Sequence, residues 1–80
     1  MTVSVLLFAR YREAAGRDRL RIEVPAPATL WQVWQQVQAT VPSLRGEMRP
    51  LLACNRCYAP PDRVVDDADE IAVFPPVSGG

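Results

Sequence analysis

Eighty residues, 49% of them hydrophobic and 22% charged, predict a single folded domain over residues 1–80, near the lower size limit for one hydrophobic core. Nine arginines balance nine acidic residues without forming a basic block, so we expect neither nucleic acid nor a membrane as a partner. The chain has no histidine and no lysine, which removes the usual general base and the commonest zinc ligand. We therefore expect no metal site and no catalysis by the isolated chain.

The chain begins with a predicted strand, a short helix and a second strand. Residues 2–8 are rich in β-branched and aromatic side chains, which is typical of a strand. Residues 9–15 predict two helical turns, ended by Gly16 at the position where helices commonly enter the left-handed region. Residues 19–24 alternate between polar and apolar side chains, which predicts a second strand with one apolar side: Leu20, Ile22 and Val24.

The main helix is predicted to begin after Thr29. Thr29 and Gln32 have the spacing of a capping box, in which each side chain accepts a hydrogen bond from the other residue's backbone amide. The apolar residues that follow recur at helical spacing and form one stripe: Leu30, Val33, Trp34, Val37 and Val41. Pro42 marks the end of the helix. A helix with one apolar stripe is expected to lie across a sheet.

The second half of the chain predicts a hairpin and a final strand. Residues 51–54 and 58–59 form the two short strands of the hairpin about Asn55 and Arg56, and residues 70–74 form the last strand. Residues 43–49 are expected to form a short turn or helical fragment, residues 60–62 an irregular crossing, and residues 66–69 a turn. Together the elements predict the α+β class, with a mixed sheet of about five strands packed on one main helix.

Alternation along the first and last strands predicts two sheet faces of different character. The residues expected to point towards the helix are Val3, Val5, Leu7, Ile71 and Val73. The residues expected on the outer face include Leu6, Phe8 and Phe74, with Tyr58 of the hairpin placed to join them. We interpret this apolar outer face as a docking patch for a partner protein. The alternative is that loops cover it, or that the strand phase is shifted by one residue.

Residues 75–80 predict an extended, flexible tail. Pro75 and Pro76 have no amide hydrogen to donate, so sheet pairing stops there and polyproline geometry is favoured. Residues 76–80 would then project roughly 15 Å from the domain.

The last four residues favour one chemistry: Val77, Ser78, Gly79 and Gly80. A Gly-Gly backbone is thin enough to enter a narrow cleft and leaves the terminal carboxylate unshielded. A carboxylate becomes a good electrophile only after one oxygen is converted into a leaving group, as in an acyl-adenylate. The sequence therefore favours the Gly80 carboxylate as the working group, with Val77 and Ser78 as a grip for a partner.

Three segments carry a family resemblance: residues 7–16 (LFARYREAAG), residues 53–55 (ACN) and residues 67–80 (DADEIAVFPPVSGG). Through them, and through the order of its elements, the whole chain resembles the small subunit of molybdopterin synthase, a MoaD-type sulfur carrier. The resemblance implies a ubiquitin-like (β-grasp) roll. The sequence departs from the family at Ala68, where glycine is frequent, so a different turn backbone is expected there.

The resemblance implies a sulfur carrier subunit that is not an enzyme on its own and binds no cofactor. An adenylating enzyme of the ubiquitin-activating type would use ATP to form a Gly80 acyl-adenylate, which a sulfur donor protein converts to a thiocarboxylate. The tail would then enter the large subunit of the synthase and give sulfur to cyclic pyranopterin monophosphate in molybdenum cofactor biosynthesis. Two sulfurs per product imply a heterotetramer of two small and two large subunits.

The resemblance also implies contact residues. Apolar contacts with both partners would come from Phe8, Tyr58 and Phe74, and a weaker contact from Arg12. The partner would also hold the tail at Pro75, Pro76, Val77 and Ser78, while Gly79 leaves clearance around the sulfur carried by Gly80.

Other functions stay open. One is a sulfur carrier for thiamine synthesis or tRNA thiolation, although the insert at residues 9–16 argues against the thiamine type. Another is a ubiquitin-like protein modifier joined to lysines of its targets. A third is a thiol redox protein using Cys54 and Cys57, but this C-x-x-C pair spans a predicted hairpin, which favours structural thiols. The acidic residues of the following turn are read as solvated, not as a metal site: Asp66, Asp67, Asp69 and Glu70.

The start of the chain indicates the compartment. The first strand-like run, residues 3–9, is too short for a membrane-spanning helix and lacks the basic start and cleavage site of a signal peptide. The expected location is the cytoplasm, where cysteines remain thiols.

Overall fold

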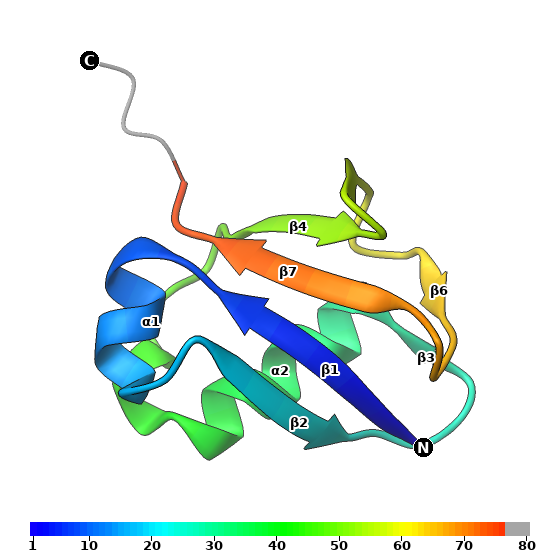
Figure 1. Cartoon of the computed structure of the whole chain (residues 1–80), viewed down its shortest axis with the longest axis horizontal. Coiled ribbons are helices and arrows are strands. Elements are labelled where there is room, and N and C mark those ends of the chain that lie inside the picture. The colour runs from blue at the N-terminus through cyan, green and yellow to red at the C-terminus, as the bar shows by residue number, and fades with distance from the viewer. Residues whose placement is uncertain (77–80) are drawn as a thin grey trace.

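A five-stranded mixed sheet with one long helix packed across one face forms the body of the protein (Figure 1). The computed structural model describes residues 1–76. In spatial order the strands of this sheet are β2 (Arg19–Glu23), β1 (Thr2–Leu7), β7 (Glu70–Phe74), β4 (Leu51–Cys54) and β5 (Cys57–Tyr58). β1 and β7 pair in parallel, and the other neighbours pair antiparallel. The predicted α+β class and mixed sheet are confirmed.

The short helix α1 (Ala9–Ala15) joins the parallel strand β1 to its antiparallel neighbour β2. Gly16 ends the helix with φ of 74°, and its amide donates to the carbonyl oxygen of Arg12 over 2.9 Å. A left-handed residue at this position lets the chain reverse while the last helical carbonyl groups remain hydrogen-bonded. The predicted helix and its end are confirmed.

The main helix α2 (Leu30–Thr40) is fixed at its start by the predicted capping box. The Thr29 hydroxyl accepts from the Gln32 amide over 3.2 Å, and the Gln32 side-chain oxygen accepts from the Thr29 amide over 2.8 Å. Such caps stabilise a helix by about 1 kcal/mol. All of the predicted apolar stripe is buried: Leu30, Val33, Trp34, Val37 and Val41.

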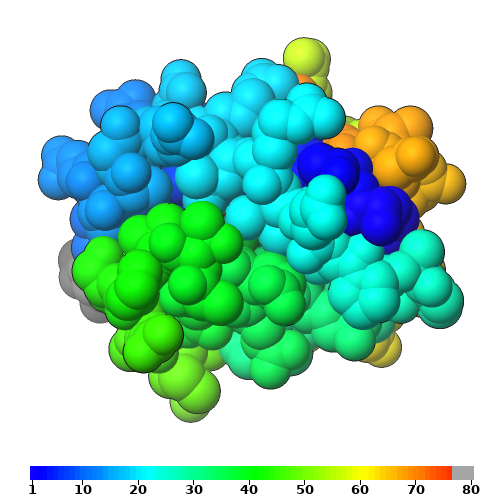
Figure 2. All heavy atoms as spheres, turned by 90° about the horizontal axis from the view of Figure 1, so that it is seen from below, coloured from blue at the N-terminus to red at the C-terminus, as the bar shows by residue number. Residues whose placement is uncertain are grey.

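The core lies between α2 and the inner face of the sheet. The strand residues predicted to point inwards are at most 1% exposed: Val3, Val5, Leu7, Ile71 and Val73. The largest buried side chains are Trp34 and Tyr11, whose ring centroids lie 5.2 Å apart. Figure 2 shows residues of α2 and β2 lying directly against each other, as the contacts between the two elements require.

A second, two-stranded sheet was not predicted from the sequence. β3 (Ala28–Thr29) pairs with β6 (Val64–Val65) at the start of α2. Backbone hydrogen bonds extend this contact, from the Leu30 amide to the Arg63 carbonyl and from the Trp31 amide to the Pro61 carbonyl, both over 2.9 Å. The sheet holds the connection between β5 and β7 against the helix. After α2, the short 3-10 helix η1 (Pro42–Leu44) overlaps the region predicted to be a short turn or helical fragment.

One local prediction is corrected by the structure, and the expectation of a different turn backbone at Ala68 agrees with it. The second hairpin strand is Cys57–Tyr58, one residue earlier than predicted, because Asn55 and Arg56 make a two-residue turn with positive φ at both positions. Ala68 is not among the residues with positive φ, so the turn before β7 forms without the left-handed backbone that glycine would permit.

No helix within residues 1–76 has the length and apolar character needed to cross a membrane. Within the same residues, no three cysteine or acidic side chains come close enough together to hold a metal ion.

Candidate functional site

The outer face of the sheet carries a groove of about 430 Å³. The residues that line it are Leu6, Phe8, Ala53, Arg56, Tyr58, Glu70, Ala72 and Phe74. They come from β1, β4, β5 and β7 and from the ends of these strands. The groove therefore belongs to the sheet as a whole, and four of its residues are those predicted for an apolar outer face.

Strand register explains why the face is hollow. Leu6 lies opposite Ala72, Ala72 opposite Ala53, and Ala53 opposite Tyr58, so one row of side chains crosses four strands. Residues directly opposite each other in adjacent strands project on the same side of the sheet. The two alanines in the middle of the row form a low floor, and Leu6 and Tyr58 rise on either side of it.

Three aromatic rings form one end of the groove. The rings of Phe8 and Phe74 are stacked, with centroids 4.5 Å apart and planes 12° apart. The Tyr58 ring meets Phe74 edge to face, with a centroid distance of 6.1 Å. Phe8 is 38% exposed and Tyr58 is 72% exposed, so this aromatic cluster presents apolar surface to solvent. Clustered exposed aromatic side chains are typical of protein–protein contact sites.

The position of Phe8 depends on the anchoring of α1, because Phe8 is the residue that caps this helix. The Glu47 carboxylate accepts from the Arg10 guanidinium over 2.6 Å and from the Tyr11 hydroxyl over 3.1 Å. The indole nitrogen of Trp34 donates to the Glu47 carbonyl over 3.1 Å. Glu47 therefore ties α1, which begins directly after Phe8, to α2.

The protonation states in this network follow from its contacts. The hydrogen bond from Arg10 holds the pKa of the Glu47 carboxyl below its usual value. Burial raises the pKa of the Tyr11 hydroxyl far above its usual value, and the hydrogen bond to Glu47 raises it further. At neutral pH the network thus contains a carboxylate and a neutral phenol, which is the pairing that its hydrogen bonds require.

The hairpin turn closes the other end of the groove. Asn55 holds the turn to β7: its side chain donates to the Asp69 carboxylate and accepts from the Glu70 amide, both over 2.9 Å. Arg56 and Glu70 form an ion pair of 3.7 Å at the rim. Asp69 also accepts from the Asp66 amide over 2.8 Å. The predicted turn is present, and Asp66 and Asp67 are exposed as expected. Asp69 and Glu70, however, are half-buried and hold contacts within the hairpin region, so they are less solvated than predicted.

The two cysteines lie opposite each other across the hairpin and are both free thiols. Cys54 is buried, and burial raises the pKa of its thiol, with the nearby Asp69 carboxylate acting in the same direction. It therefore stays protonated and fits the predicted structural role. Cys57 is exposed on β5, so a core packing role does not extend to it.

A second groove of about 340 Å³ was not predicted from the sequence. Its lining includes Trp31, Met48, Leu51 and Pro61, and Tyr58 also borders it. Trp31 lies off the apolar stripe of α2 and is half-buried against the edge of the core. Met48, which is 67% exposed, was the available signal, since a large apolar side chain between charged neighbours has no obvious core position.

The chain matches known proteins along almost its whole length. A sequence model of the ThiS family matches residues 5–80. The chain belongs to the ThiS family. Its relatives include proteins named molybdopterin synthase sulfur carrier subunit from Arabidopsis thaliana and Mycobacterium tuberculosis. The Arabidopsis thaliana protein is 38% identical, with 98% of this chain and 82% of that protein covered. The Mycobacterium tuberculosis protein is 36% identical, with 98% and 96% covered.

Solved structures place the ThiS-family chain in the same fold. It superposes with a TM-score of 0.87 on a putative molybdopterin converting factor, subunit 1, from Pyrococcus furiosus, at 29% identity with 96% of this chain and 99% of that chain covered. The TM-score is also 0.87 with small archaeal modifier protein 1 of H. volcanii, at 25% identity with 95% and 98% covered. The predicted ubiquitin-like β-grasp fold and the predicted family are confirmed.

The structure brings together some of the predicted contact residues of this ThiS-family chain and separates others. Phe8, Tyr58 and Phe74 meet in the aromatic cluster. Arg12 is exposed on α1 and is not among the residues that line the groove.

The tail begins at this cluster. Pro75 is half-buried and Pro76 is exposed directly after Phe74, where the chain leaves β7 (Figure 1). The remaining predicted site residues lie outside the described part of the chain: Val77, Ser78, Gly79 and Gly80.

Proposed function

We propose that this chain is the sulfur carrier subunit of a molybdopterin synthase, and that its Gly80 carboxylate carries the sulfur. Relatives given this name match nearly the full chain at 38% and 36% identity. The single structural observation that supports the role is the course of β7. This strand ends at Phe74 inside the aromatic cluster and leads directly into Pro75, so a protein docked on the groove would lie beside the base of the tail.

The chemistry proposed for Gly80 has two activation steps. A carboxylate oxygen attacks the α-phosphorus of ATP on an adenylating enzyme, and pyrophosphate leaves. A persulfide sulfur of a donor protein then attacks the acyl carbon and displaces AMP, which gives an acyl disulfide. A thiol cleaves its S–S bond and forms a disulfide with the donor, and the thiocarboxylate is left on Gly80. Gly79 keeps the neighbourhood free of side-chain bulk, and Val77 and Ser78 provide contacts for the partner that holds the tail.

Sulfur delivery is proposed to occur on the large subunit of the synthase. The thiocarboxylate sulfur forms a C–S bond with cyclic pyranopterin monophosphate, and water then hydrolyses the bond between that sulfur and the Gly80 carbonyl carbon, which restores the carboxylate of the small subunit. Because each product receives two sulfurs, we propose an assembly of two small and two large subunits. In this proposal the chain contributes the carried sulfur and the docking face, while the partner enzymes bind ATP and catalyse the reactions. All of these steps are proposed to take place in the cytoplasm.

Mass spectrometry of the intact chain tests the proposal. The chain is incubated with the adenylating enzyme, ATP and a sulfur source, and the expected mass gain equals the replacement of one oxygen by sulfur. Deletion of Gly80 should abolish the gain while leaving the circular dichroism spectrum unchanged. Transfer is then measured with the large subunit and the pterin precursor. An unmodified wild-type chain in the presence of all components would contradict the proposal.

Replacement of Cys54 and Cys57 by serine separates sulfur carriage by Gly80 from thiol redox chemistry. If Gly80 is the carrier, the doubly substituted chain gains the same mass as the wild type. Loss of the mass gain in this variant alone, with its fold intact, would indicate that the cysteines carry the sulfur.

A second candidate, protein modification, is favoured by the similarity to small archaeal modifier protein 1. It predicts isopeptide adducts between the C-terminus of this chain and lysines of other proteins. Detection of such adducts in the organism, absent when Gly80 is deleted, would support this function. Loading without transfer to the pterin precursor would separate it from the synthase role.

A further inference from the structure

Two arginines extend the outer face of the sheet beyond the apolar groove. Arg19 lies opposite Leu6 and Arg21 opposite Ser4 in the pairing of β2 with β1. Opposed residues of an antiparallel pair share one face, so both arginines project on the same side as the groove. Leu6 itself lines the groove, which places Arg19 at its border. Both arginines are exposed, whereas Leu20 between them points into the core.

These two arginines differ from the arginines that support the fold. Arg10 forms an ion pair with Glu47, and Arg56 forms one with Glu70. Within residues 1–76 neither Arg19 nor Arg21 has an ion-pair partner or a side-chain hydrogen bond. The acidic residue at the far end of β2, Glu23, accepts a hydrogen bond from Thr2. The β2 border of the groove next to Leu6 thus carries two arginines that form no ion pair within residues 1–76.

The charge is uneven around the groove. The Arg56–Glu70 pair on the hairpin side is close to neutral as a unit. The chain as a whole also has zero net charge, so a general attraction to acidic proteins is not expected. A local positive border beside an apolar surface instead favours one orientation of a partner that has carboxylates at the matching place.

We propose that Arg19 and Arg21 form an electrostatic border of the docking face, and that the other subunit of the synthase meets it with an apolar surface bordered by carboxylates. This inference rests on the proposed function, since it takes the synthase subunit as the occupant. An exposed border charge acts mainly on the rate of association, because the interaction reaches through solvent before contact is made. The apolar cluster acts mainly on the rate of dissociation.

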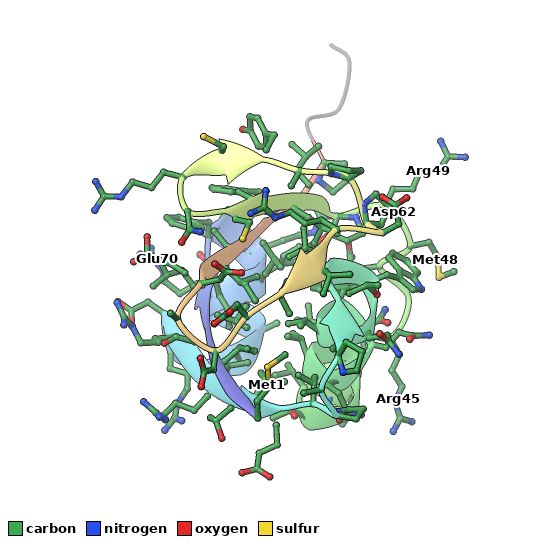
Figure 3. All side chains as sticks on the ribbon, turned by 90° about the vertical axis from the view of Figure 1, so that its right-hand side faces the viewer. Met1, Arg45, Met48, Arg49, Asp62 and Glu70 are labelled. Atoms are coloured by element: carbon green, nitrogen blue, oxygen red, sulfur yellow. The ribbon has the colours of Figure 1, made fainter. Side chains whose placement is uncertain are left out.

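A charge-reversal pair with a matched control tests the border. The test variant carries Arg19→Glu and Arg21→Glu, and the control carries Arg45→Glu and Arg63→Glu. Figure 3 shows Arg45 on the α2 side of the molecule and Glu70, which lines the groove, on the opposite side. Arg63 is exposed and lines neither groove. Both variants change the net charge equally. A difference between them therefore reports the position of the substituted charges and not the net charge of the chain.

Association with the purified large subunit is measured by surface plasmon resonance over a range of salt concentrations. In dilute salt the test variant should associate about tenfold more slowly than the wild type, and high salt should remove the difference. The control should stay within about twofold of the wild type. A third variant, with Arg19→Lys and Arg21→Lys, keeps the charge and should retain most of the wild-type association rate. Circular dichroism checks that all variants are folded.

The outcomes separate this inference from the proposed function. If the test variant associates as fast as the wild type while Phe74→Ala weakens binding, the arginine border is refuted and the synthase role stands. Equal slowing in the test and control variants would also refute the border, because net charge alone would explain it. If the wild type fails to bind the large subunit, the inference fails, and the Gly80 mass assay then decides the proposed function by itself.

Discussion

The two faces of the five-stranded sheet are built by the same strands but are covered differently. On the inner face Val5 and Ile71 are fully buried beneath α2. On the outer face Leu6 and Ala72, the next residue in each strand, line an open groove. Successive residues of a strand point to opposite sides, so each strand contributes to the core and to the groove at once. Folding therefore uses one face, while the other remains available for apolar side chains that serve binding.

This division explains how such a small domain can keep aromatic rings exposed. Contacts on the inner face hold the strands in register, and the register then fixes Phe8, Tyr58 and Phe74 relative to one another. Apolar surface left in solvent favours binding, because covering it gains about 25 cal/mol per Å² before the entropic and desolvation costs of association are subtracted. The outer face should consequently tolerate substitution for folding and be sensitive to it for binding.

The largest effect on stability is expected from truncation on the inner face. Ile71→Ala should lower the free energy of unfolding by about 2–5 kcal/mol, because it leaves a cavity at a position with no exposed surface. Urea denaturation measures the loss. Leu6→Ala, a truncation on the outer face, is the matched control and should cost less than about 1.5 kcal/mol, since this side chain is only half-buried. Equal losses would show that the outer face also belongs to the core.

The converse effect is expected for binding. Phe74→Ala removes the ring that contacts both Phe8 and Tyr58, and it should weaken binding to the large subunit by about 2 kcal/mol, or about 30-fold in the dissociation constant. Stability should fall by only about 1 kcal/mol, the value of an exposed aromatic pair. Isothermal titration calorimetry and urea denaturation measure the two effects. Unchanged binding would remove the aromatic cluster from the interface.

Sequence alone predicted the two faces because each strand repeats its pattern over several residues. Val3, Val5 and Leu7 recur with the period of a strand, and the stripe of α2 recurs with the period of a helix. The capping box of α2 could also be predicted, since Thr29 and Gln32 are three residues apart in the same segment. Local chemistry of this kind needs no knowledge of the tertiary structure.

The features that sequence missed depend on residues far apart in the chain. β3 and β6 contain only two residues each, and their pairing is set by the route of the chain past α2. Glu47 contacts Arg10 and Tyr11, which lie more than thirty residues earlier in the chain. Nothing in the sequence around Glu47 indicates either partner. The second groove likewise arises where separate loops meet around Tyr58.

The Glu47 network joins α1 to α2, and its contribution to stability should be sensitive to acid. Its carboxyl has a pKa below the ordinary value of 4.5, so the ionised group stabilises the fold above that pH and the contribution is lost as the pH falls below it. Glu47→Gln should cost about 1 kcal/mol near neutral pH, because the Tyr11 hydroxyl would donate to an uncharged oxygen.

The difference in the free energy of unfolding between the wild type and Glu47→Gln should therefore shrink as the pH is lowered and Glu47 becomes protonated. Urea denaturation at several pH values gives the two curves. Asp69, whose pKa is also lowered, chiefly by its hydrogen bond from Asn55, is present in both chains and cancels in the difference. A difference that stays constant down to acidic pH would show that the Glu47 charge contributes nothing to the fold.

The smallest change in stability is expected at the hairpin turn, where a substitution should stabilise the domain and not destabilise it. Arg56 has φ of 70°, a left-handed conformation that costs a residue with a side chain roughly 1 kcal/mol. Glycine at the second position of this kind of turn removes that cost. Arg56→Gly should therefore raise the free energy of unfolding by about 0.5–1 kcal/mol, because the 3.7 Å ion pair with Glu70 is too exposed to offset the gain.

Asn55 is the matched control for this turn, since its φ of 53° is also left-handed. Asparagine tolerates this conformation, and its side chain makes the hydrogen bonds to Asp69 and to the Glu70 amide that hold the turn against β7. Asn55→Gly should consequently destabilise the domain, although the two substitutions are neighbours and alike. Urea denaturation measures the change in the free energy of unfolding for both substitutions. Destabilisation by Arg56→Gly would show that the contacts of the arginine side chain stabilise the hairpin by more than its left-handed backbone costs.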